Sequence, residues 1–115
     1  GLARDCWQSF GPTQVPLGDC AAVRAGGVEV VLITKRTQAL GLELFRNLGI
    51  EPTARRIVVV KSTNHFMAAF GPIAGQVIYI DADGPLKRDY RRIPYTRVNR
   101  PIWPLDEATS PGLIF

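Results

Sequence analysis

The sequence has few of the residues that usually hold metal ions or perform thiol chemistry. It contains one histidine and two cysteines, and Cys6 and Cys20 do not form a C-x-x-C pair. A catalytic zinc site usually needs three protein ligands drawn from His, Asp, Glu and Cys, so we expect no metal site in this chain alone. Two cysteines are also too few for a disulfide-rich secreted scaffold, and we expect two reduced thiols in a cytoplasmic protein.

Long apolar runs are absent as well. The longest, residues 28–34 and 57–60, are the size of strands and are far shorter than the roughly 20 residues that span a bilayer. No signal peptide is recognisable, and the only methionine is Met67. We therefore expect no membrane partner, and we expect the chain to be a piece of a longer protein.

Three sequence motifs are also absent, and this reduces the number of function classes that the sequence supports. The sequence has no G-x-G-x-x-G, no P-loop and no G-x-S-x-G, so dinucleotide binding, nucleotide binding and serine hydrolysis have no motif to support them.

What is present is an ordinary globular composition with excess positive charge. The 115 residues are 46% hydrophobic and 21% charged, which suits a single soluble domain over residues 1–115. The net charge is +4, and a late segment contributes five arginines: Arg88, Arg91, Arg92, Arg97 and Arg100. Such a segment can contact nucleic acid, dock an acidic partner or form a solvated face. Few aromatic residues are interleaved with it, so nucleic acid is the least favoured of the three.

The chain pattern predicts a hairpin followed by alternating helices and strands. Residues 1–18 carry Gly11, Pro12, Pro16 and Gly18 and predict an irregular lead-in. Two apolar runs, residues 19–24 and 28–34, flank the Gly26-Gly27 pair and predict a hairpin. Leucines at helical spacing predict a short helix that ends near Gly49.

The second half of the pattern sets the expected fold class. Residues 55–61 and 76–82 predict strands, with a helix over residues 63–75 that breaks at Gly71-Pro72 and a turn at residues 83–85. Helices between strands imply crossovers, so we expect an α/β domain with a small, mixed, partly parallel sheet. Recurrent prolines predict that residues 85–115 form an extended tail, in which Trp103 anchors either to this domain or to a partner.

The end of the apolar run "IVVVK" is the candidate site. Lys61, Ser62 and His65 follow a strand at the point where a helix should begin, and ligands of open α/β sheets bind at the carboxyl ends of strands. A cation, a hydroxyl and an imidazole there can hold a carboxylate, a phosphate or a developing oxyanion. A plainer interpretation is that Ser62 simply caps the helix.

Several stretches resemble the C-terminal domain of the microcystinase C (MlrC) family, from about Gly18 to Asp106. The most specific are K-S-x-x-H-F-x-x-A-F at residues 61–70 and R-P-I-W-P-L-D at residues 100–106. The family is related to the bacterial metallopeptidase that degrades linearised microcystin. The resemblance implies a parent protein that is a zinc-dependent peptidase or amidohydrolase, with its zinc ligands mainly in an N-terminal catalytic domain.

The resemblance also gives the candidate residues a role. Lys61 and Ser62 match the family motif and are expected to bind a peptide or amide substrate. His65 is expected to be catalytic, either by orienting the substrate, by stabilising the tetrahedral intermediate or by donating a proton. This chain is expected to be inactive alone and to hold no zinc. The alternative is a non-catalytic docking or anion-binding module of a larger protein.

Overall fold

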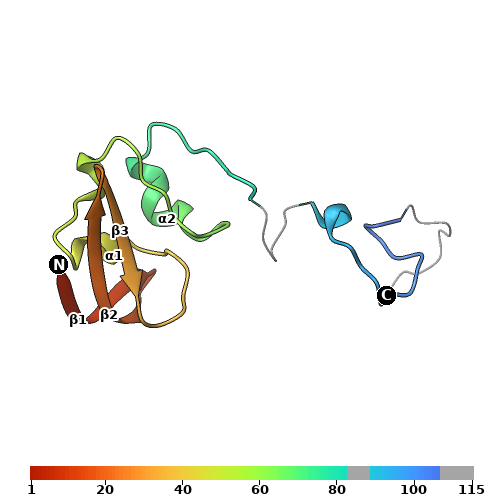
Figure 1. Ribbon diagram of the computed structural model, residues 1–115, viewed down its shortest axis with the longest axis horizontal. Coiled ribbons are helices and arrows are strands. Elements are labelled where there is room, and N and C mark those ends of the chain that lie inside the picture. Colours follow the sequence, from red (N-terminus) through yellow and green to blue (C-terminus); the bar gives the residue numbers. More distant parts are fainter. Residues whose placement is uncertain (83–88, 107–115) are drawn as a thin grey trace. The chain divides into compact units, whose positions relative to one another are not determined.

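The computed structural model describes residues 1–82 and 89–106, and it divides the chain into two compact units, residues 1–77 and 78–115. The first unit is built on a three-stranded sheet, whose arrows are seen in Figure 1. Its strands are β1 (Leu2–Phe10), β2 (Thr13–Ala25) and β3 (Val28–Ile33), and each pairs antiparallel with the next.

The predicted hairpin is confirmed, and its second strand, β3, follows the Gly26-Gly27 turn. The two glycines have φ angles of 54° and 81°, which only glycine adopts without steric cost, so this pair closes a tight turn. Val23 pairs with Val30 in the ladder below the turn.

The predicted irregular lead-in is wrong, because residues 2–10 form β1 and residues 13–18 begin β2. The register of β1 shifts between Ala3 and Cys6 and again between Cys6 and Trp7, and Asp5 has a φ of 49°. Such a bulge interrupts the alternation of inward and outward side chains. The sequence pattern of β1 is therefore not that of a regular strand.

The predicted mixed, partly parallel α/β sheet is also wrong. Among the described residues the sheet is entirely antiparallel, and the rest of the chain is coil with a few short helices. Residues 55–61 and 76–82, expected to be strands, belong to no sheet. Their β-branched residues favour extended backbone, but a strand also needs a neighbour with which to exchange hydrogen bonds.

The predicted helices are reduced to single turns. The first becomes α1 (Glu43–Arg46), and the second becomes α2 (Met67–Phe70) followed by the 3-10 helix η2 (Gly71–Ile73). Another 3-10 helix, η1 (Pro52–Ala54), lies where a loop was predicted. The break expected at Gly71-Pro72 is where α2 passes into η2. No helix in the described part of the chain is both long and apolar enough to cross a membrane.

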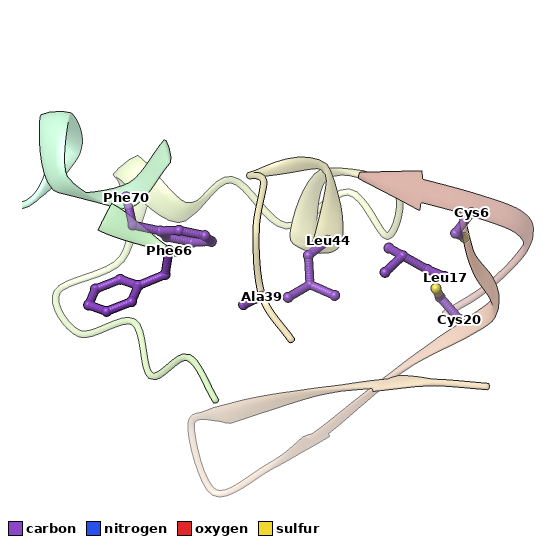
Figure 2. Packing of buried hydrophobic residues seen from close by; sticks show 7 residues of the cluster. All are labelled: Cys6, Leu17, Cys20, Ala39, Leu44, Phe66 and Phe70. Carbon is purple, nitrogen blue, oxygen red and sulfur yellow. The ribbon is translucent and has the colours of Figure 1, made fainter. Parts of the chain in front are cut away.

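The core of the first unit joins the sheet to these short helices. Its buried members are Cys6, Leu17, Cys20, Ala39, Leu44, Phe66 and Phe70. Figure 2 shows Phe66 and Phe70 at one end of this cluster and Cys6 and Cys20 at the other. Val58, Val60 and Val77 pack against it from the extended segments. The core therefore fixes residues 58–60 in place although they are not part of the sheet.

The second unit is described over residues 78–82 and 89–106. It contains one 3-10 helix, η3 (Tyr90–Arg92), and a loop over residues 100–106 that Asp106 closes by binding Arg100 and the backbone nitrogen of Ile102, the latter at 2.8 Å. Trp103 in this loop is 77% exposed. The turn predicted at residues 83–85 lies outside the described residues, as do residues 85–88 and 107–115 of the predicted tail.

Candidate functional site

Gln38 brings two of the three predicted site residues together. The Ser62 Oγ donates a hydrogen bond to the Gln38 Oε1 at 2.8 Å, and the Gln38 Nε2 lies 3.2 Å from the His65 Nδ1. Lys61 precedes Ser62 and is exposed, and its ammonium has no hydrogen bond or ion pair within the described residues. The side chains of Ser62 and His65 are thus held by a common partner, while that of Lys61 has none in the described part of the chain.

The expected helix start at Ser62 is wrong. Helix α2 begins at Met67, its N-cap is Phe66, and no side chain caps it. Ser62 therefore does not act as the cap of α2. With only four residues, α2 also offers no extended helix dipole to an anion. The N-terminus of α2 is therefore not part of the candidate site.

A buried glutamine holds the backbone on which Gln38 sits. The side chain of Gln8, in β1, is fully buried, and its Nε2 donates to the carbonyl oxygen of Gln38 at 2.8 Å. Its Oε1 accepts from the backbone nitrogens of Leu40, at 2.9 Å, and Gly41, at 3.2 Å. The backbone of this loop therefore bonds to the Gln8 amide oxygen twice and to one of its two N–H groups. The position of Gln38 is thereby tied to the sheet.

Phe10 packs against the imidazole of His65. The two ring centroids are 5.2 Å apart and the planes are inclined at 58°. Phe10 is the last residue of β1, so the ring reaches His65 from the end of the sheet. We refer to Phe10, Gln38, Ser62 and His65 as the Gln38 cluster.

The hydrogen bonds within the Gln38 cluster determine which donor and acceptor atoms are left to bind a ligand. In the tautomer of His65 in which Nδ1 accepts from the Gln38 Nε2, the ring proton lies on Nε2. That N–H is available to an oxygen of a ligand. Because the hydroxyl hydrogen of Ser62 is used by Gln38, its oxygen can accept from a ligand. With the ammonium of Lys61, the surface offers two donors and one acceptor.

Two members of the cluster, Phe10 and Gln38, were not recognised in the sequence, and neither was Gln8, which binds the backbone of Gln38. Gln8 and Phe10 lie in the segment expected to be irregular, where no inward or outward face could be assigned. Once β1 is known, a polar residue at an inward position is a usable signal, because buried polar side chains are rare and need partners. No pattern in the sequence identified Gln38 as part of a site.

The two cysteines are free and buried, as the prediction of reduced thiols requires. Burial, reinforced by a hydrogen bond with Cys6 and by nearby negative charge, raises the pKa of the Cys20 thiol to about 12. Since the thiolate is the reactive form of cysteine, Cys20 is not a nucleophile near neutral pH.

The described residues do not form a metal site. No three His, Cys, Asp or Glu side chains within residues 1–82 and 89–106 are grouped closely enough to hold a metal ion. His65, the only histidine, has the amide of Gln38 and the ring of Phe10 as its neighbours. A zinc ion therefore does not fit the candidate site as these residues build it.

The candidate residues lie on an open surface. Lys61 and His65 are exposed and Ser62 is half-buried. Two hollows of about 300 and 360 Å³ lie elsewhere, one lined by Cys6, Trp7 and Lys35 among others, the other by Val23, Glu29 and Arg55 among others. A closed binding site around the Gln38 cluster requires a second wall.

Two comparisons with known proteins agree. The family described as "MlrC C-terminus" matches residues 3–97. Microcystinase C of Sphingomonas sp is 30% identical over 106 residues, which are 92% of this chain. The same match covers 20% of the Microcystinase C chain, so this chain spans about one fifth of the length of that relative.

Proposed function

The chain belongs to the MlrC C-terminus family, and from this premise we propose that it is the C-terminal domain of an MlrC-type, zinc-dependent metallopeptidase or amidohydrolase of the cytoplasm. The similarity to Microcystinase C, of which the chain covers one fifth, supports a parent protein with a further, larger part. In this proposal the N-terminal catalytic domain binds the zinc ion, and the present chain is inactive alone.

The observation that carries the proposal is the shared bonding of Ser62 and His65 to Gln38 on an exposed surface. One amide holds both polar side chains, and the backbone of that residue is held in turn by the buried Gln8. Side chains held in this way suit a site that must bind a ligand in one orientation. We propose that this surface is the far wall of the substrate cleft.

The available donors and acceptor match an amide substrate. The His65 Nε2–H is suited to donate to the oxygen of the scissile carbonyl, where negative charge develops during hydrolysis. The ammonium of Lys61 is suited to a carboxylate of the peptide, and the Ser62 oxygen to a peptide N–H. In this role His65 stabilises the oxyanion by donating a hydrogen bond, and it does not transfer its proton.

The alternative, a docking or anion-binding module, has weaker support. Three of the late arginines are already paired with carboxylates: Arg91 with Asp89, Arg92 with Asp81 and Arg100 with Asp106. These pairs neutralise part of the positive charge on which binding of a polyanion would depend. We therefore favour the cleft-wall function over the docking or anion-binding function.

The proposal is tested by replacing His65 in the complete parent protein. We expect His65→Ala to lower kcat for a cleaved linear peptide amide by about 10²–10³-fold, the usual effect of removing one oxyanion donor. Thr63→Ala, an exposed neighbour outside the cluster, should leave kcat within about twofold. Zinc content and the free energy of unfolding are measured on each variant. Unchanged turnover of His65→Ala, with zinc bound and the fold intact, would overturn the proposal.

A further inference from the structure

Residues 57–60, Ile-Val-Val-Val, form an extended segment with no strand beside it. Within the described residues, no backbone group of this segment takes part in a hydrogen bond. Figure 1 accordingly draws the chain between η1 and α2 without an arrow. Four consecutive β-branched residues are nevertheless the composition of a strand.

The side chains of the segment alternate as those of a strand do. Val58 and Val60 pack against the core of the first unit. Ile57 and Val59 point away from it and are 82% and 75% exposed. The segment therefore has one face buried by its own domain and one apolar face left uncovered, together with a row of free backbone donors and acceptors.

Both ends of the segment are held. Before it, the Arg55 Nε donates to the Glu29 carboxylate of β3 at 2.8 Å. After it, Ser62 is bonded to Gln38. The strand edge is thus presented in a fixed extended conformation, which lowers the conformational entropy that a partner has to overcome on pairing.

We propose that residues 57–60 are an edge strand to which the larger part of the parent chain adds a β-strand. This inference rests on the proposed function, because the partner is the rest of an MlrC-type protein. The chain is one fifth of the length of Microcystinase C and matches the C-terminus of the family, so four fifths of such a protein lie outside the matched region. Strand addition uses free main-chain groups for affinity and alternate side chains for specificity.

Strand addition would also explain how the cleft closes. Lys61 follows Val60 directly, and Ser62 follows Lys61. A strand paired with residues 57–60 therefore brings the rest of the parent chain beside the candidate site. The Gln38 cluster would then acquire the second wall that it lacks in this chain.

The proposal is tested by hydrogen–deuterium exchange of the amides of residues 57–60, in the complete parent protein and in the 115-residue chain alone. We expect the two alternate amides that face the added strand to exchange at least about a hundredfold more slowly in the complete protein, because only there is the segment paired. The amides of Val30 and Leu32, which by the alternation of the antiparallel ladder face β2, serve as the matched control and should be protected in both samples. The mass of each sample in solution is measured by light scattering at the same concentrations.

Two results would overturn the proposal. Equally fast exchange of residues 57–60 in both samples would show that no strand is added. Protection in the isolated chain that appears only as it dimerises would show that a second copy, not the rest of the parent, covers the edge. Neither result depends on turnover, so a failure here is distinguishable from a failure of the His65 test.

Discussion

Gln8 is fully buried, and three of its hydrogen bonds end on one loop. Its amide oxygen accepts from the backbone nitrogens of Leu40 and Gly41, and its amide nitrogen donates to the carbonyl of Gln38. No buried side-chain polar atom among the described residues is left without a partner. A single residue of β1 therefore determines where Gln38 can reach, and through Gln38 the positions of Ser62 and His65.

This role gives a prediction for Gln8→Met, which keeps the length of the side chain and removes its polar atoms. The backbone groups of residues 38, 40 and 41 would lose their partners inside the protein, so we expect the free energy of unfolding to fall by about 2–4 kcal/mol. Urea denaturation of the 115-residue chain measures the change. Gln14→Met, at an exposed position of β2, is the control and should cost less than about 0.5 kcal/mol. Equal losses in the two variants would show that the Gln8 amide is not needed.

The candidate site could be predicted from the sequence only in part. Lys61, Ser62 and His65 were recognised by their place after an apolar run and by the family motif. Their partner was not, since Gln38 lies 24 positions from Ser62 and 27 from His65 and no local pattern connects them. The cap assigned to Ser62 failed because a hydroxyl bonds whichever acceptor the fold brings near, and here that acceptor is Gln38.

At the scale of elements, the start of α1 is set by its contact with β1. The Glu43 carboxylate accepts from the backbone nitrogen of Ser9 at 3.1 Å, which ties the first residue of α1 to the strand. Gly41 lies in this contact, where a Cβ atom would come within 2.8 and 2.9 Å of the backbone oxygen and nitrogen of Ser9. Only a residue without a side chain lets the two elements approach so closely.

We therefore expect Gly41→Ala to destabilise the domain by about 1–3 kcal/mol, the usual cost of overpacking against rigid backbone. The gain in helix propensity from alanine is smaller than this penalty, because Gly41 lies outside α1. Thermal and urea unfolding of the 115-residue chain give the change. The matched control is Gly75→Ala, since nothing lies within 4 Å of a Cβ atom there. A stabilised Gly41→Ala variant would show that the contact is loose.

How well each element could be predicted depends on where its partner lies. The β2–β3 hairpin was predicted correctly because its signal, two glycines between apolar runs, is local. Strand β1 was missed because the bulge at Asp5 removes the alternation of a regular strand. Residues 57–60 were predicted to be extended, as they are, but the expected sheet requires a neighbour that no described residue provides.

At the scale of the whole molecule, much of the apolar surface is concentrated in strand-like segments. On β3, Val28, Val30 and Leu32 are 61, 48 and 52% exposed, in addition to the outward residues of segment 57–60. Scattered exposed apolar residues are normal, but runs of them usually mark an interface. This surface suits the proposal that a chain about one fifth as long as the relative it matches forms a cleft together with the remainder of a larger protein.

The measurement that tests the cleft wall most directly is protection of residue 61 from a small reagent. In the complete parent protein carrying Lys61→Cys, the rate of alkylation by iodoacetamide is followed by mass spectrometry, with and without a peptide hydroxamate that inhibits turnover. With the inhibitor at about ten times its Kd, we expect alkylation to slow about tenfold, because the occupied cleft covers residue 61. Lys35→Cys, beside a separate hollow, should react at the same rate in both samples. Equal rates at residue 61 with and without the inhibitor would contradict the account.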